Sequence, residues 1–501
     1  MMDLEKARIE FSDLQKKISA FNHATALIYF DGETFAPSET LDNRAHSLEI
    51  LNDELYQLKT GEKTVELLDY LEENKDWLTV RERRSLEFMQ RELRKKKSIP
   101  KDEYVEYEHL LAEAQDAWHR AREEDDFDIL CPYLEKIFDS VRRFASYCAP
   151  DKDPYDYCLD NYEEGLESKT CDKIFDSIKA NIIPLVHKIT ERPQIDNSCL
   201  RGDFSAEDQE SLAIYIMELL KINMNRVGLA TSEHPFVSFM GSHYDERITT
   251  KYSRKDYSSS LYTVMHEVGH VLYDMGQPDN LAYTVLDGGT SMVLLESQAR
   301  FYENIVGRSK TFIEYIYPTL EELFPDPISE YTPEDIYKAV NMVEPGLNRI
   351  DSDELTFNIH VLIRYELEKA IMHNELQVKD LPKAWAEKYK EYLGVEVKDY
   401  ANGILQDIHW PFGAIGYFPA YVLGNAYAAN ITEKMKEDID LEECLAEGNF
   451  ALINLWNKEH IWKHGGLYNS KEIMEKYVGV EFSADPFINY LENKYKEVYD
   501  L

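Results

Sequence analysis

The 501-residue sequence contains no apolar run of 18 residues or more, so we expect no transmembrane helix. The first residues are charged from Asp3 onward and lack the apolar core of a secretory signal peptide. Cysteine is scarce: the six residues are scattered without a CxxC pair, which indicates free thiols in a reducing compartment. These absences predict a cytoplasmic protein that contacts no membrane.

Positive charge is also in short supply. Lys and Arg number 55 against 94 Asp and Glu, which gives a formal net charge of −39. Such a charge repels phosphate backbones and argues against binding of nucleic acid. Its simplest explanation is a solvated acidic surface, and a preference for basic substrates is the alternative. Hydrophobic residues make up 44% of the chain, enough for a large core.

Most of the sequence has the periodicity of amphipathic helices, with apolar residues three to four positions apart. In the first 150 residues the pattern predicts helices at 3–20, 42–60, 64–78, 80–97, 102–124 and 131–147. Residues 237–253 are rich in β-branched and aromatic side chains, and there we expect a short hairpin. From Tyr257 the helical pattern returns and continues to the end. The sequence predicts a mainly α protein with a small sheet.

His266, Glu267 and His270 form an HExxH motif. On a helix, residues four apart are offset by about 40°, so both imidazoles face one side and can hold one Zn²⁺. Glu267 lies beside the open coordination position, where it can take a proton from the zinc-bound water. Apolar flanking residues favour a helix, and Ser258–Ser260 can cap its start. The alternative is a pair of buried structural histidines with a surface glutamate.

Glu296 is the candidate for a third metal ligand. It lies 26 residues beyond His270, in a stretch at 294–300 that we predict to be a second helix. A carboxylate from a neighbouring helix completes a His₂Glu site and leaves the fourth position to water, as zinc hydrolases require. The alternative is a glutamate that faces solvent.

Several ordered blocks resemble the carboxypeptidase Taq family of zinc metallocarboxypeptidases, from about Tyr29 to the C-terminus and most densely over 230–470. The blocks are HPF at 234–236, DxRxT at 245–249, HExxH at 266–270, ESQ at 296–298, Arg349 through Asp353, GxxQDxHW at 403–410, GAIGYFPAY at 413–421 and HGGLY at 464–468. FDGET at 30–34 resembles the family's WDxxT with an aromatic swap. Agreement of so many blocks in order and spacing supports the resemblance.

Two blocks depart from the family pattern. Leu295 stands where the family has His before the third-ligand Glu. The block written I/V-R-x-x-A-D begins here with Asn348 and has Ser352 in place of Ala. The ligands and Glu267 are intact, so the resemblance implies an active enzyme, and the departures concern the surroundings of Glu296 and the specificity.

The resemblance implies a large helical metallopeptidase fold with a deep cleft between two helical walls and a small β-sheet near the active site. We expect a single peptidase domain over 1–501, in which residues 1–200 form a wall and lid of the cleft and residues 201–501 carry the zinc. The resemblance also implies one Zn²⁺ per chain, for which Co²⁺ or Mn²⁺ can substitute, and a homodimer.

The activity implied by the resemblance is removal of single C-terminal residues from peptides with a free C-terminal carboxylate. Zn²⁺ polarises the scissile carbonyl, and Glu267 passes the proton of the attacking water to the leaving amine. His409, Tyr417 and Tyr421 are the candidates that face the reacting group and stabilise the oxyanion. For the two tyrosines, packing in the core is the alternative.

An exopeptidase also needs a cation for the free carboxylate, and the planar fork of Arg grips both oxygens. Arg349 is the first candidate and Arg247 the second. Either can instead form an internal salt bridge with acidic residues close to it in sequence, such as Asp245 and Asp353. His234 is expected to line the cleft or to orient a zinc ligand.

Two other functions are weighed against the carboxypeptidase. An oligoendopeptidase of the related thimet-like helical group shares HExxH and a downstream Glu but has no need of a carboxylate-binding Arg. A catalytically weak scaffold protein retains the fold of the family without most of its activity. The blocks at 349–360 and 403–421 favour the carboxypeptidase, and the intact ligands and Glu267 argue against the scaffold.

Overall fold

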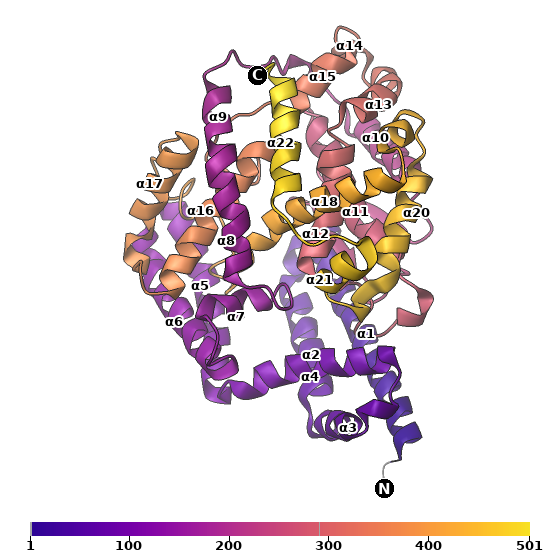
Figure 1. Ribbon diagram of the computed structural model, residues 1–501. Helices are drawn as coiled ribbons and strands as arrows, with labels where there is room; N and C mark the ends of the chain where they lie inside the picture. Colours follow the sequence, from indigo (N-terminus) through magenta and orange to yellow (C-terminus); the bar gives the residue numbers. More distant parts are fainter. Residues whose placement is uncertain (1–2, 290) are drawn as a thin grey trace.

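The computed structural model describes residues 3–289 and 291–501, and helices form nearly all of its regular structure (Figure 1). The first six are α1 (Leu4–Thr34), α2 (Leu41–Thr60), α3 (Glu62–Glu73), α4 (Val80–Ser98), α5 (Lys101–Glu124) and α6 (Cys131–Cys148). All six predicted helices are confirmed. However, α1 continues past residue 20 because no Pro or Gly interrupts it before Gly32, although its middle buries little. The third helix ends at Glu73 rather than at residue 78, and a 3₁₀ turn follows.

The sheet has three strands: β1 (Val227–Thr231), β2 (Val237–Phe239) and β3 (Glu246–Thr250), in the order β1-β3-β2. The predicted hairpin is confirmed, since β2 pairs antiparallel with β3 and Val237 lies opposite Ile248. The parallel strand β1 was not predicted. Its sequence, VGLAT, carries Gly and Ala, which have low strand propensity, and pairing with β3 overrides that preference.

Of the remaining helices, four precede the sheet in the chain and twelve follow it. They are α7 (Pro154–Asp160), α8 (Ser168–Ser177), α9 (Ile183–Thr190), α10 (Ala206–Leu219), α11 (Ser258–Met275), α12 (Met292–Arg300), α13 (Lys310–Leu323), α14 (Pro325–Ile328), α15 (Pro333–Val340), α16 (Glu354–Met372), α17 (Leu381–Leu393), α18 (Pro419–Asp438), α19 (Leu441–Ala446), α20 (Phe450–His460), α21 (Ser470–Ile473) and α22 (Asp485–Val498). None of the described helices is long and apolar enough to cross a bilayer.

One long stretch contradicts the expectation of helices up to the end of the chain. Residues 394–418, between α17 and α18, form turns without a helix. Gly413 and Gly416 have φ of 74° and 85°, a left-handed conformation that ends helical progression. Glu368 on α16 anchors the stretch by accepting hydrogen bonds from Trp410 Nε1 and the Gly416 N–H, at 2.6 and 3.0 Å.

Two glycines allow three helices to pack closely. Helix α12 packs between α11 and α18. A Cβ at Gly269 on α11 would come within 2.5 Å of Ala299 Cα on α12, and one at Gly424 on α18 within 2.7 Å of Glu296 Cγ. Any side chain at either position would therefore push α12 away from its neighbours.

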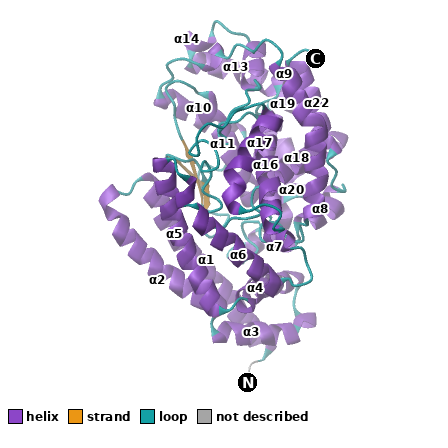
Figure 2. Cartoon of the chain, turned by 90° about the vertical axis from the view of Figure 1, so that its left-hand side faces the viewer, coloured by secondary structure: helices purple, strands orange, loops and turns teal. Residues whose placement is uncertain are grey.

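The buried apolar residues form two separate clusters. The smaller cluster joins α1, α3 and α4 through residues such as Phe11, Leu68 and Leu86, and the larger begins at Ile99 and runs to Tyr499. Helices α1–α6 lie together in the lower half of Figure 2, and the sheet lies at the upper side of this group. The division of the single domain into residues 1–200 and 201–501 stays a prediction. The boundary between the two apolar clusters lies elsewhere in the chain, after α4.

Candidate active site

The HExxH motif lies on α11, as predicted, and β3 packs beside this helix. The predicted capping by Ser258–Ser260 is wrong, because none of these side chains caps the helix. Asp256 does so instead: its Oδ1 accepts hydrogen bonds from the N–H of Ser258 at 2.8 Å and of Ser259 at 3.4 Å. A carboxylate at this end also complements the partial positive charge of the helix N-terminus.

His266, His270 and Glu296 come together across α11 and α12. One candidate ligand atom from each lies within 4.8 Å of the other two. The two imidazole rings are 4.9 Å apart and nearly perpendicular, at 86°. His266 Nε2 and Glu296 Oε2 are 4.0 Å apart. The second helix predicted at 294–300 is α12, which begins at Met292.

A hydrogen bond at Nδ1 orients each histidine and directs its Nε2 away from the hydrogen-bonded residue. His270 Nδ1 donates to the Leu295 carbonyl at 3.1 Å, and His266 Nδ1 bonds to Glu303 Oε2 at 2.9 Å. Because a carbonyl only accepts, the proton of neutral His270 is on Nδ1 and the lone pair is on Nε2. Burial lowers the pKa of His270 to about 3, so the ring stays neutral. Partners of this kind orient metal-binding histidines.

Arg300 holds the two carboxylates of the site. Its Nε donates to Glu296 Oε1 at 2.7 Å and its Nη1 to Glu303 Oε2 at 3.1 Å. Burial alone raises the pKa of Glu296, but Arg300 and His266 outweigh it, and the pKa lies below its usual value. Glu296 is therefore ionised, and Oε2 has no hydrogen-bond partner among the described residues.

These observations fit a divalent cation. Two imidazole nitrogens and one carboxylate oxygen lie close to one another, and each has its other polar atom already bonded to protein. His₂Glu is a donor set of catalytic zinc sites. Glu267 is buried beside these residues, and burial raises its pKa to about 7. His266, His270 and Glu296 would hold the ion, and Glu267 has the position of a proton acceptor.

A second network surrounds Arg349. Its Nε and Nη2 both donate to Asp407 Oδ1, at 3.2 and 2.9 Å. Arg364 donates from Nε to Asp407 Oδ2 at 2.6 Å. The salt bridge foreseen as an alternative therefore exists, but with a residue distant in sequence, because Asp353 caps α16 instead. Arg349 Nη1 has no acceptor within the part of the chain that the structure describes.

The Arg349 network contains more positive than negative charge. Two guanidinium groups share the single carboxylate of Asp407, and Arg364 is completely buried. The adjacent histidines are neutral and add no further charge, because burial lowers the pKa of His409 to about 4 and that of His360 well below its usual value. A buried surplus cation is costly unless an anion pairs with it.

Tyr421 lies between the two networks. Its ring is 5.3 Å from that of Tyr417 and 5.3 Å from the Arg349 guanidinium carbon, and Glu296 acts on its pKa. His409 is 5.4 Å from Tyr417, ring to ring. Burial raises the pKa of both phenols, so both remain protonated donors. The structure thus brings His409, Tyr417 and Tyr421 together beside the third ligand.

Arg247 and His234 lie elsewhere, on and near the sheet. Arg247 on β3 bonds to Asp245 Oδ2 at 3.1 Å, which is the internal salt bridge foreseen for it, and its side chain is 33% exposed. His234 is exposed in the turn between β1 and β2, and the residues that orient the two histidines of α11 are Glu303 and Leu295.

The sequence analysis missed Arg300, Glu303 and Arg364, and it assigned no role to Asp407. The first two could have been found, because Arg300 and Glu303 follow Glu296 by four and seven residues and so share its helix face. Asp407 carries no such signal. Its two arginines lie 58 and 43 residues away, on other segments.

The chain is similar to known metallopeptidases over nearly its whole length. Residues 10–495 match the family model of the carboxypeptidase Taq (M32) metallopeptidases. The chain is 36% identical to carboxypeptidase 1 of Bacillus subtilis (strain 168), covering 99% of this chain and 100% of that protein. It is 35% identical to thermostable carboxypeptidase 1 of Pyrococcus furiosus, over 96% of each chain.

Solved structures agree over the same length. The crystal structure of the M32 carboxypeptidase from Deinococcus radiodurans R1 superposes with a TM-score of 0.95 at 30% identity, covering 99% of this chain and 100% of that one. The Pyrococcus furiosus carboxypeptidase gives 0.93 at 33% identity, over 99% of both chains. The predicted mainly α fold with a small sheet is confirmed. The chain belongs to the carboxypeptidase Taq (M32) family of metallopeptidases.

Proposed function

We propose that this metal-dependent carboxypeptidase releases single C-terminal residues from peptides, with Arg349 as the anchor of the substrate's free carboxylate. The metallocarboxypeptidase activity itself follows from the family. The observation that carries the proposal is the surplus cation of the Arg349 network, with two guanidinium groups against one carboxylate and an unpaired Nη1. A C-terminal carboxylate supplies the missing anion, and an internal peptide group does not.

Glu267 acts as the general base in this proposal. Burial raises its pKa toward neutrality, so it can accept the proton of the attacking water and then pass it to the leaving amine. A divalent ion held by His266, His270 and Glu296 would polarise the scissile carbonyl and lower the pKa of the water. The protonated phenols of Tyr417 and Tyr421, with neutral His409, donate hydrogen bonds to the developing oxyanion.

Arg247 and His234 are assigned weaker roles in substrate binding. Arg247 is already paired with Asp245, and His234 is exposed near the edge of the sheet, so contact with the distal part of a longer peptide is the role that their positions support. Truncating either side chain should affect long peptides more than dipeptides.

An assay with paired substrates tests the proposal. A blocked dipeptide with a free C-terminal acid is compared with the same peptide amidated at its C-terminus. Cleavage of the acid alone supports the carboxypeptidase. Cleavage of both indicates an oligoendopeptidase, and cleavage of neither indicates a scaffold.

The finer predictions on metal, assembly and location are part of the same proposal. The His₂Glu donor set supports one Zn²⁺ per chain, with Co²⁺ or Mn²⁺ able to replace it. The six unpaired cysteines support a reducing, cytoplasmic location, and the family resemblance supports a homodimer. Elemental analysis, chelation followed by metal add-back, and sedimentation test the ion and the assembly.

A further inference from the structure

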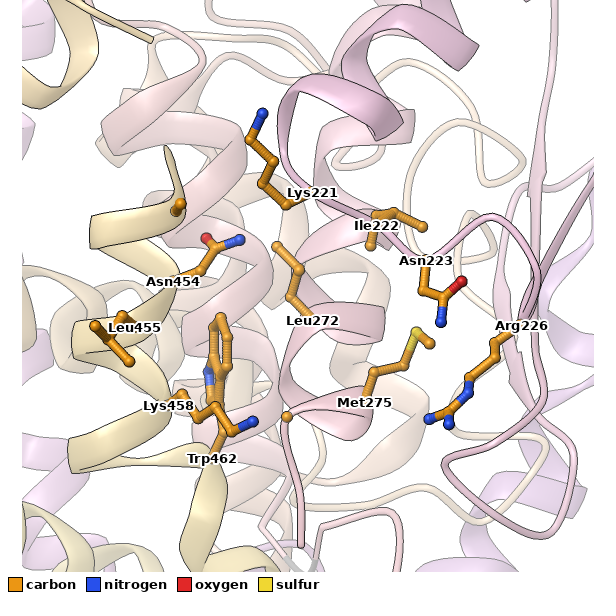
Figure 3. A pocket seen from close by; sticks show the side chains of 12 residues that line it. Lys221, Ile222, Asn223, Arg226, Leu272, Met275, Asn454, Leu455, Lys458 and Trp462 are labelled. Carbon is orange, nitrogen blue, oxygen red and sulfur yellow. The ribbon is translucent and has the colours of Figure 1, made fainter. Parts of the chain in front are cut away.

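A groove with a volume of about 400 Å³ lies at the C-terminal end of α11 (Figure 3). Its walls come from the segment after α10, the last turn of α11, and α20 with the residues that follow it. The lining residues are Lys221, Ile222, Asn223, Arg226, Leu272, Met275, Gly276, Ala451, Asn454, Leu455, Lys458 and Trp462. This size falls within the range of pockets that hold small ligands or a few side chains.

The groove is distinct from the candidate active site. On α11, Leu272 lies about 200° and Met275 about 140° around the helix from His270, so both point away from the metal-binding face. Trp462 forms part of the opposite wall and donates from Nε1 to Gln298 Oε1 at 2.8 Å. The groove therefore lies behind the metal-binding helices and cannot receive the scissile bond.

Its charge is opposite to that of the molecule. Lys221, Arg226 and Lys458 surround the groove in a chain of net charge −39, and no carboxylate is among the lining residues. In Figure 3 the three cations lie around the apolar side chains of Leu272, Met275 and Trp462. Among residues 3–289 and 291–501, no carboxylate is ion-paired with the two lysines.

Two carboxylates lie near these cations. Glu459, next to Lys458 in the sequence, pairs with Lys463 at 2.7 Å. Arg226 stacks over the ring of Tyr244 at 4.7 Å, and the exposed Asp279 lies near both, since Tyr244 and, to a smaller extent, Arg226 lower its pKa. The groove thus offers unneutralised positive charge beside an apolar floor, and Leu455, which is 52% exposed, extends that apolar surface outward.

We propose that this groove binds a short acidic peptide segment of another protein, with one apolar side chain on the Leu272–Trp462 floor and carboxylates on Lys221 and Lys458. The apolar floor favours a peptide over a nucleic acid, which the net charge of the chain also repels. A free amino acid fits poorly because the lining has no carboxylate for its ammonium group. Charge complementarity supplies encounter and specificity, and the apolar contact supplies the anchor.

Fluorescence anisotropy of a labelled peptide tests the proposal on the full-length, metal-loaded protein. The probe is an N-acetylated octapeptide of Glu with one central Leu, amidated at its C-terminus so that it lacks the carboxylate recognised by the proposed Arg349 anchor. We expect saturable binding that weakens with added salt. The same probe with Leu replaced by Ser should bind more weakly, because it loses the apolar contact.

Two charge-reversal variants provide the matched comparison. Lys221→Glu with Lys458→Glu should weaken binding by about tenfold or more. Lys383→Glu with Lys390→Glu changes the net charge equally on exposed positions of α17, on the other side of the molecule from α20 in Figure 1. This control should change the affinity little.

Leu455→Ser is a further variant that keeps the fold, because the side chain is largely exposed, and it should weaken binding without a change of charge. Equal losses in the two charge-reversal variants, equal affinity for an oligonucleotide of the same charge, or undiminished binding to the Lys221/Lys458 variant would each overturn the proposal. Self-association abolished by the Lys221/Lys458 variant, without peptide binding by the parent, would assign the groove to a second copy of the chain instead.

Discussion

The two buried polar networks of the active site differ in what they leave unsatisfied. In the metal network, His266, His270 and Glu296 present lone pairs to one another, and their remaining polar atoms are held by Glu303, the Leu295 carbonyl and Arg300. In the Arg349 network the surplus consists of N–H donors and positive charge. Each network therefore lacks a ligand, of positive charge for the first and of negative charge for the second.

This difference indicates which ligand each network takes. Converging lone pairs are stabilised by a cation, and a surplus guanidinium is stabilised by an anion. Tyr421 and Phe357 join the two, since Arg300 lies 4.5 Å and Arg349 6.0 Å from the Phe357 ring. Under the proposed function one peptide end reaches both networks: its carboxylate pairs with Arg349, and its scissile carbonyl approaches the ion that His266, His270 and Glu296 would hold.

The largest effect is expected from Glu267→Gln, which changes the proposed base without removing a ligand. Turnover should fall by roughly 10²- to 10⁴-fold, because proton transfer by a placed side chain contributes about that much. Metal content by elemental analysis should stay at the parental value. A variant within a few-fold of the parent would exclude Glu267 as the base.

Arg349→Ala breaks the second network. We expect the transition-state stabilisation measured by kcat/KM for the free-acid substrate to fall by roughly 2–5 kcal/mol. The difference in kcat/KM between the acid and the amidated substrate should narrow. Arg349→Lys should retain only part of the activity, because the ammonium group of Lys cannot form the two parallel hydrogen bonds of a guanidinium group. Arg247→Ala is the matched control and should keep the discrimination. If Arg247→Ala instead loses the discrimination between acid and amide, Arg247 and not Arg349 is the carboxylate anchor.

Glu303→Gln sharpens the comparison because it keeps all three candidate ligands and changes the carboxylate that holds His266 and Arg300. An amide cannot reproduce the charged acceptor for His266 Nδ1, so metal affinity should weaken by about 10- to 100-fold. Competition with a fluorescent chelator measures this directly. The exposed Glu481→Gln is the control. Unchanged affinity would show that His266 needs no such partner.

Gly269→Ala tests the packing that brings the metal network together. A methyl group 2.5 Å from Ala299 Cα should separate α11 from α12 and lower the free energy of unfolding by about 1–3 kcal/mol. Gly346→Ala, where the nearest atom is 3.8 Å away, should be close to neutral. Urea denaturation compares the two. Equal stability would contradict the close approach.

A third buried cluster contrasts with both networks, because the carboxylates of Asp274 and Glu246 have no cation paired with them among the described residues. Burial raises the pKa of Asp274 to about 8 and that of Glu246 well above its usual value, and neither Glu246 oxygen has a hydrogen-bond partner among the described residues. The folded state therefore binds more protons than the unfolded state. Stability should fall as pH rises from about 4 to about 8, by up to about 1.4 kcal/mol per pH unit and proton.

Asp274→Asn should reduce that slope, since it removes one of the two groups and keeps an acceptor for Gln277. Urea denaturation at pH 6 and pH 8 gives the measurement. A variant with the parental slope would assign the pH dependence to other groups.

The sequence by itself determined the helical class, the first six helices and the residues proposed to bind the metal. Periodicity and the HExxH spacing are local properties: two histidines one turn apart share a helix face whatever surrounds the helix. The 26-residue gap to Glu296 was interpretable only because a second helix could be predicted there. The capping residue of α11 and the non-helical stretch at 394–418 were missed because caps and turns depend on single residues.

Tertiary structure alone decided the partner of Arg349, the parallel strand β1 and the division of the core. Asp407 reaches Arg349 and Arg364 because residues 394–418 fold back over α16, and no local pattern encodes that return. The charge surplus of that network likewise arises from residues on segments that are distant in sequence. Local spacing therefore sufficed to predict the proposed cation site, whereas the proposed anion site depends on long-range packing, which brings together charges that the sequence keeps far apart.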